Sequence, residues 1–272
     1  IIKKEKIHIV FFRIAPHQAY DFLLYAVCKT LKVKTVMFER TNLPHLIFPV
    51  RSYENINDEF VNIKSRKKIS DKSIKFLKKI KSNYKQGMPN HVKLKIKKFK
   101  GGEYPSFIKN LFQKFKKLCL DILFRKERII TFKKFFFDII NLQRNKLIYN
   151  FYIKNSLKAD LTKKFIFVAL QCEPERQANP QGGFFFNQLK MIEFLSKSVP
   201  KDYVIYVKEH ISQFKSYQNC CLSKNNDYYK KIISLKNVKL INFSYNSFEL
   251  IDEARMVALV SGSVGFESLV EK

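Results

Sequence analysis

The sequence is 272 residues long, which is enough for two domains of ordinary size. Hydrophobic residues make up 46% of it, so a sizeable core can form, which argues against global disorder. The formal net charge of +29 raises nucleic-acid binding as a hypothesis, but abundant Lys, Ile, Asn and Phe are also typical of an AT-rich coding sequence.

The first predicted elements form a β-α-β unit. Ile7 to Phe12 and Val33 to Phe38 are short apolar runs of the kind that form strands. Between them, apolar residues recur at helical spacing at Tyr20, Leu23, Leu24, Val27 and Leu31. We expect a parallel pair of strands joined by a right-handed crossover.

The segment after Arg51 is basic and shows few structural signals. Val61 to Lys100 holds fifteen Lys or Arg and a single acidic residue, Asp71. It has few aromatic side chains on which bases could stack, so we expect no nucleic-acid partner. The surplus Lys is then compositional drift, or it serves an anionic membrane surface or acidic ligands.

A helical region, Phe107 to Lys158, comes next. No apolar run in the chain approaches the roughly 20 residues needed to span a bilayer. The number of cysteines, five, is odd, no CxxC pair occurs, and two of them are adjacent in sequence. This pattern favours neither a disulfide framework nor a zinc site. We expect a cytoplasmic protein without a metal, with a peripheral contact to the anionic inner membrane as a further hypothesis.

Strands and helices alternate from Ala159 onward, which predicts a doubly wound α/β domain. We expect strands at Phe165–Leu170, Tyr203–Val207, Val238–Ile241 and Met256–Val260, and helices through Leu189–Leu195, Tyr228–Leu235, Phe248–Ala254 and the residues that follow the turn at Ser261–Gly265. Asn246 and Glu249 have the spacing of a capping box at a helix start. Ligands of such sheets bind beyond the carboxyl ends of the strands, so the residues that follow each strand are the candidates for a site.

Two carboxylates follow the first of these strands. Glu173 and Glu175 flank a proline in the loop that begins at Gln171. Either could act as a general base on an acceptor hydroxyl, or position a sugar. The alternative is an ordinary loop whose acids pair with Arg176 and nearby lysines.

The second strand ends in Lys208 and Glu209, followed by His210. A cation and an imidazole at a strand terminus suit a diphosphate or a phosphodiester, because His can donate a hydrogen bond and Lys supplies charge. The alternative is that His210 is structural.

The last strand ends in a run of small residues, namely Ser261, Gly262, Ser263, Val264 and Gly265. Small residues let backbone N–H groups and a helix N-terminus approach phosphate oxygens closely. Glu267, which we place in the first turn of the following helix, could accept hydrogen bonds from ribose hydroxyls. The run is neither a Walker loop nor GxGxxG, and by itself it is also compatible with an ordinary tight turn.

These motifs resemble the capsule polysaccharide biosynthesis family, which contains the Kdo transferases of capsule assembly. The resemblance covers roughly residues 160–272 and keeps the order and spacing of Glu173-Pro174-Glu175 with Pro180 and Gly182-Gly183, Gln188-Leu189, Tyr206 to His210, Asn237-Val238, Ser247 to Ile251, and Ser261 to Glu267. The family's His-Pro pair is His210-Ile211 here, so the imidazole is kept and the proline is not.

The resemblance implies a GT-B architecture, with two Rossmann-like domains and the donor nucleotide on the second. Residues 1–160 would form the N-terminal, acceptor-side α/β domain with a basic helical insertion. Residues 161–272 would form the nucleotide-sugar-binding α/β domain, truncated at its C-terminus. Because residue 1 is Ile and the last residues read as an interrupted helix, we expect a piece of a longer protein.

The implied activity is that of a glycosyltransferase that uses no bound metal or cofactor. It would move a sugar, for example Kdo from CMP-Kdo, to a capsular or other surface polysaccharide or a glycolipid acceptor. The donor phosphate would be held by Lys208, His210, Ser261, Gly262, Ser263 and Gly265, the ribose by Glu267, and acid/base or acceptor work would fall to Glu173 or Glu175. The alternatives are a nucleotide-sugar epimerase of the same fold, a non-catalytic capsule assembly or export component, and a basic polyanion-binding protein.

Overall fold

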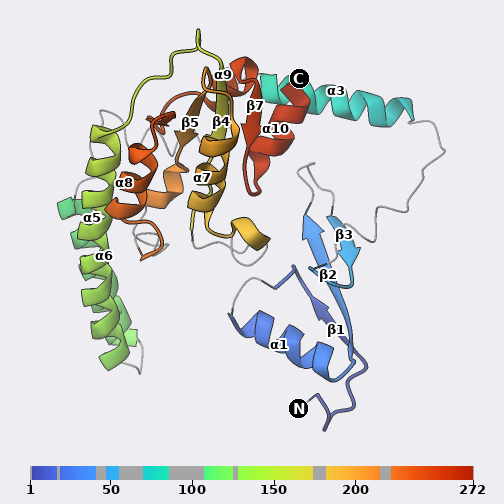
Figure 1. Cartoon of the computed structure of the whole chain (residues 1–272). Helices are drawn as coiled ribbons and strands as arrows, with labels where there is room; N and C mark the ends of the chain where they lie inside the picture. The colour runs from blue at the N-terminus through green and yellow to red at the C-terminus, as the bar shows by residue number, and fades with distance from the viewer. Residues whose placement is uncertain are drawn as a thin grey trace. The chain divides into compact units, whose positions relative to one another are not determined.

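The structure of the protein is a computed structural model, shown in Figure 1. It describes residues 2–16, 19–40, 47–54, 70–85, 107–124, 128–173, 182–214 and 222–271. The chain divides into two compact units, residues 1–83 and 84–272. This division lies N-terminal to the predicted boundary between residues 160 and 161.

The first unit contains a three-stranded sheet in the order β1-β2-β3. Its elements are β1 (Ile9–Phe12), α1 (Ala19–Thr30), β2 (Lys34–Arg40) and β3 (Ile47–Val50). β1 and β2 are parallel and α1 connects them, as predicted. β3 runs antiparallel to β2 and was not predicted from the sequence. It contains Pro49, which an edge strand tolerates because one side of its backbone needs no ladder hydrogen bond.

The second unit is built on a four-stranded sheet in the order β6-β5-β4-β7, and every neighbouring pair is parallel. The strands are β4 (Phe165–Ala169), β5 (Val204–Lys208), β6 (Val238–Ile241) and β7 (Met256–Ala258). The helices described in the rest of the chain are α3 (Asp71–Lys85), α5 (Phe107–Phe124), α6 (Arg128–Lys154), η1 (Gly183–Phe185), α7 (Gln188–Ser198), η2 (Ile211–Phe214), α8 (Asn226–Ser234), α9 (Ser247–Glu253) and α10 (Ser263–Glu271). The predicted α/β class with a parallel sheet is confirmed.

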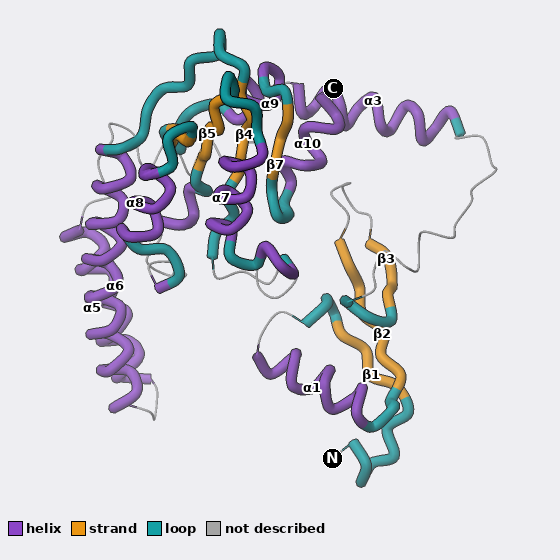
Figure 2. The backbone as a smooth tube through the Cα atoms, in the orientation of Figure 1, coloured by secondary structure: helices purple, strands orange, loops and turns teal. Residues whose placement is uncertain are grey.

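Helices cover both faces of this sheet, and Figure 2 shows the strands lying between them. Every residue of β4 is buried. On one face Val168 belongs to a cluster with Tyr152 of α6 and Ile192 of α7, and on the other Phe167 belongs to a cluster with Leu250 of α9. A strand buried on both faces reads as a continuous apolar run, which is why this one could be predicted.

Local capping fixes where the helices begin and end. The Asn187 side chain accepts a hydrogen bond from Leu189 N–H at the start of α7, and that helix ends two residues before Pro200. Asn246 accepts from Phe248 N–H at the start of α9 and donates to Glu249 through its side-chain amide. The N-cap that was predicted at Asn246 is therefore present.

α5 and α6 pack against each other as a helical pair, with an ion pair of 3.0 Å between Lys114 and Asp138. At its C-terminal end, α6 joins the core of the second unit, where the Tyr152 hydroxyl donates to the carbonyl of Ile241 and accepts from the N–H of Glu209. This contact explains why the second unit begins before residue 161. Among the helices in the described part of the chain, none is long and apolar enough to cross a membrane.

Candidate functional site

The strand topology brings the predicted strand ends to one edge of the second sheet. Lys208 lies opposite Ala169 in the β4–β5 pair, and Ala258 lies opposite Val168 in the β4–β7 pair. Because all four strands are parallel, the residues that follow them emerge together at the carboxyl edge. The later strands β5 and β6 lie on one side of β4 and β7 lies on the other, so the winding reverses between β4 and β7. Parallel α/β sheets bind ligands at such a reversal.

Gln171, directly beyond β4, joins three elements at this reversal. Its side-chain Nε2 donates to Ser261 Oγ, beyond β7, at 2.6 Å. Its backbone N–H and C=O pair with the side-chain amide of Gln188, the first residue of α7, at 2.7 and 3.1 Å. Gln188 is fully buried and Gln171 nearly so. The ends of β4 and β7 and the start of α7 are thereby held in fixed positions.

Gly262 adopts a backbone conformation that only glycine accepts easily, with φ +114°. A Cβ at this position would lie 3.2 Å from the Nε2 atom of Gln171. Gly262 and Ser263 are both exposed, and α10 begins at Ser263. The predicted turn therefore presents exposed backbone at a helix N-terminus, the arrangement that suits an anion.

Lys208 and Glu267 lie behind this turn rather than on its surface. The Lys208 ammonium donates to the carbonyl of Tyr245 at 2.6 Å and to Ser247 Oγ at 2.5 Å, at the start of α9. Burial lowers the pKa of Lys208 to about 8, and the charge of Glu267 opposes that shift. Glu267 is buried and lies in the second turn of α10, so its predicted place in the first turn is wrong: the helix already starts at Ser263, inside the small-residue run and earlier than that run suggested.

A buried ion pair links the ends of β4 and β5. Lys224 Nζ lies 3.1 Å from both carboxylate oxygens of Glu209, and both side chains are fully buried. Lys224 also donates to the carbonyl of Gln171 at 2.5 Å, and the Tyr229 hydroxyl donates to Glu209 at 2.8 Å. Burial raises the pKa of Glu209, while Lys224 opposes the rise. Sequence analysis missed Lys224 and Tyr229, which lie in a polar stretch that gives no sign of burial.

The backbone of His210 is bonded to this buried pair. Its backbone N–H donates to the Glu209 carboxylate at 2.8 Å, and its backbone carbonyl accepts from Gln213 N–H at 2.8 Å. The ring is exposed and its Nδ1 accepts from Ser212 N–H at 3.3 Å. A neutral imidazole held in this way carries its proton on Nε2.

Glu173 also lies at the carboxyl edge, where both its backbone and its side chain are hydrogen-bonded. Its carboxylate accepts from the side-chain amide of Gln188 at 2.5 Å. Its backbone N–H donates to Gln213 Oε1 at 2.8 Å, and its carbonyl accepts from Ser223 Oγ at 2.7 Å. Glu175, the other predicted carboxylate, lies outside the described residues. The structure therefore brings Glu173, His210 and the Ser261–Gly265 turn to one edge, with Lys208 and Glu267 behind the turn.

The opposite, amino edge of the sheet differs in character. A hollow of about 330 Å³ lies there, lined by Leu161, Thr162, Lys163, Lys164, Asp252, Glu253, Ala254 and Arg255. An exposed ion pair lies at this edge, where Lys164 Nζ is 2.9 Å from Asp202 Oδ2. Within the ranges that the structure describes, no group of three or more His, Cys, Asp or Glu residues comes together that could hold a metal ion.

No protein-family model, curated protein or solved structure matches the chain. The resemblance to the capsule polysaccharide biosynthesis family therefore rests on the motifs quoted above and stays a prediction.

Proposed function

We infer that the second unit binds the nucleotide part of a nucleotide sugar, and that the protein to which it belongs is a glycosyltransferase of GT-B type acting on a capsular or other surface polysaccharide. One observation carries this proposal: the exposed turn at Gly262 lies at the reversal point of a parallel sheet, where Gln171 and Ser261 are bonded to each other. Backbone N–H groups and a helix N-terminus at such a point suit a phosphate.

Each residue then has a distinct task in the transfer. The turn and the Nε2–H of His210 stabilise the phosphate of the donor, and Lys208 adds positive charge at the same edge. The acceptor hydroxyl oxygen bonds to the anomeric carbon of the sugar while the bond from that carbon to the phosphate oxygen breaks. The hydroxyl proton passes to a general base, for which Glu173 is the described candidate. The donor that fits the family resemblance is CMP-Kdo.

The direct test is to titrate the chain with CMP-, UDP-, GDP- and dTDP-sugars and to record the thermal unfolding midpoint. A ligand that binds only the folded state stabilises it by about 2.7 kcal/mol when present at about 100 times its Kd. We expect one nucleotide class to raise the midpoint, and the CMP class first. A chain that none of them stabilises would contradict the nucleotide-sugar proposal.

The role of His210 can be measured with a matched histidine variant. His210→Ala removes a charge-assisted hydrogen bond of roughly 1.5–3 kcal/mol, which corresponds to a loss of donor affinity of about tenfold to hundredfold. His8→Ala changes another exposed histidine, which directly precedes β1 in the first unit, and should leave donor affinity unaltered. Equal affinity in both variants and the parent would show that His210 is structural.

A further inference from the structure

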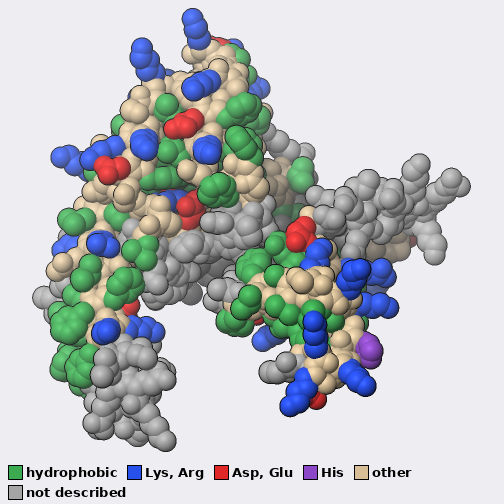
Figure 3. All heavy atoms as spheres, turned by 60° about the horizontal axis from the view of Figure 1, so that its bottom comes forward, with side chains coloured by type: hydrophobic (Ala, Val, Ile, Leu, Met, Phe, Trp, Pro, Cys, Tyr) green, Lys and Arg blue, Asp and Glu red, His purple; other side chains and the backbone are tan. Residues whose placement is uncertain are grey.

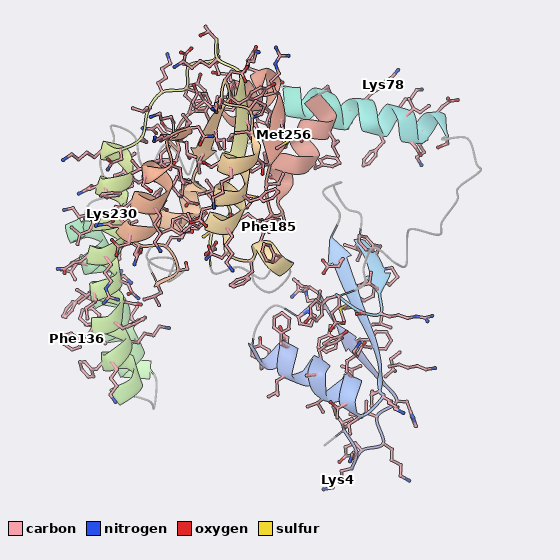
Figure 4. The ribbon with its side chains drawn as sticks, in the orientation of Figure 1. Lys4, Lys78, Phe136, Phe185, Lys230 and Met256 are labelled. Carbon is pink, nitrogen blue, oxygen red and sulfur yellow. The ribbon has the colours of Figure 1, made fainter. Side chains whose placement is uncertain are left out.

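The outer side of α6 carries a row of exposed hydrophobic side chains. Phe132, Phe136, Ile140 and Leu147 are spaced four, four and seven residues apart, so they lie on one side of the helix. Each is between 45% and 62% exposed. Figure 4 shows Phe136 projecting from the helical pair. We call these four residues the α6 stripe.

The stripe is not a part of the core that happens to be open. The packed side of α6 is a different one, where Leu142, Tyr149 and Tyr152 are fully buried. α5 packs on α6 at Phe135, whose ring centroid lies 6.4 Å from that of Phe115. A row of exposed aromatic and aliphatic side chains on a helix that is already packed elsewhere marks an interaction surface.

The charges around the stripe indicate what it contacts. Lys133 and Arg144 flank it and are exposed. The segment from residue 107 to 154 holds twelve Lys or Arg and three Asp or Glu. In Figure 3 this helical pair, on the left, shows green hydrophobic side chains interspersed with blue Lys and Arg. A second copy of the chain would bring the same positive charges to the contact, and like charges repel.

We propose that the α6 stripe docks on the surface of a bilayer that contains anionic lipids. α6 then lies along the membrane plane, with the two phenylalanine rings at the boundary between headgroups and acyl chains. Lys133 and Arg144 contact the anionic headgroups. This inference goes beyond the proposed nucleotide-sugar binding and does not depend on it, because it concerns a different surface and needs no nucleotide.

The test is sedimentation of the purified 272-residue chain with vesicles. We expect binding to phosphatidylcholine vesicles that contain about one third phosphatidylglycerol, little binding to phosphatidylcholine alone, and weaker binding as salt shortens the Debye length from about 10 Å at 0.1 M. Equal binding to both vesicle types, or binding to neither, overturns the proposal.

Substitutions in the stripe separate docking from general attraction. Phe132→Ser, Phe136→Ser and Ile140→Ser together should lower vesicle affinity by at least about tenfold, because three side chains lose their insertion into the bilayer. The matched control changes three exposed apolar residues elsewhere in the second unit, Phe194→Ser, Leu222→Ser and Leu269→Ser, and should bind as the parent does. Circular dichroism of both variants checks that each is folded. Equal losses in the two variants overturn the proposal.

A pair of charge variants makes the same distinction without removing hydrophobic side chains. Lys133→Glu with Arg144→Glu should weaken vesicle binding by at least about tenfold. Lys197→Glu with Lys201→Glu changes the net charge by the same amount on α7 and just beyond it, and should have a much smaller effect. Equal effects would show attraction by net charge alone. If light scattering instead shows a dimer that the stripe variant abolishes, a second copy is the occupant and the proposal is wrong.

Discussion

The polar residues at the two edges of the second sheet differ in their burial. At the carboxyl edge, Glu209 and Lys224 are fully buried and bonded to each other, and Gln188 is buried against Gln171. At the amino edge, the ion pair between Lys164 and Asp202 has both side chains more than half exposed. The same sheet therefore carries a buried, closely bonded polar cluster at one edge and solvated charges at the other.

This difference is informative because burying charged groups costs free energy. Well-packed apolar side chains in place of a buried ion pair often stabilise a protein as well or better. Stability alone does not explain why the carboxyl edge holds Glu209 and Lys224 inside. The cluster fixes the end of β4 at Gln171 and the end of β5 at His210, and these residues flank the proposed site. The comparison can be sharpened by breaking single members of each edge.

The largest effect is expected for Lys224→Met. This change leaves the Glu209 carboxylate buried without its cation, and breaking such a pair typically lowers the free energy of unfolding by about 3–5 kcal/mol. Urea unfolding followed by circular dichroism measures the loss. Lys164→Met, at the amino edge, should change stability barely measurably, because its pair with Asp202 is solvated and screened.

A double variant checks the cause of that loss. Lys224→Met combined with Glu209→Leu removes both charges and should recover most of the stability lost by Lys224→Met alone. If the double variant is no more stable than the single one, the unpaired carboxylate is not the main cause of the loss.

The second largest effect is expected for Gly262→Val. The φ of +114° strains any side chain, and the new Cβ would press on the amide of Gln171 at 3.2 Å. We expect a loss of about 1–3 kcal/mol in unfolding free energy and a loss of nucleotide binding. Gly183→Ala is the matched control: its φ is +54° and no atom lies within 4 Å of the new Cβ, so only a strain of about 1 kcal/mol remains. Nucleotide binding that survives Gly262→Val would place the ligand elsewhere.

The two central strands of the second unit, β4 and β5, could be read from the sequence because they are largely buried. Phe165–Ala169 and Val204–Val207 are short apolar runs, and helices with capping residues such as Asn187 and Asn246 separate the strands. The parallel sheet follows from this alternation. By contrast, β3 could not be predicted, because it is a four-residue edge strand that contains Pro49.

The side-chain partners at the carboxyl edge could not be read in the same way. Gln171 was noted only as part of a polar loop, although its amide joins β4 to Ser261. Lys208 was expected to contact phosphate, and the structure directs its ammonium to the start of α9. Hydrogen bonds between residues that are 15 to 90 positions apart leave no local pattern, so the site residues could be located at an edge but not paired.

The smallest effect concerns the pH dependence of stability through Lys208. Its pKa is about 8 in the folded protein and about 10.5 in the unfolded chain, because burial disfavours the charged form. Between these two values the unfolded chain binds more protons, so the contribution of Lys208 to stability rises as pH increases through this window. The measurement is urea unfolding of the parent and of Lys208→Met at pH 7.5, just below that window, and at pH 9.5, within it. All other titrating groups are shared by the two proteins, so the change in their stability difference comes from Lys208. The parent should gain stability relative to the variant at the higher pH. If the stability difference between parent and variant is the same at both pH values, Lys208 has an ordinary lysine pKa and is solvated like Lys164. The contrast between the two edges would then hold for Glu209 and Lys224 but not for Lys208.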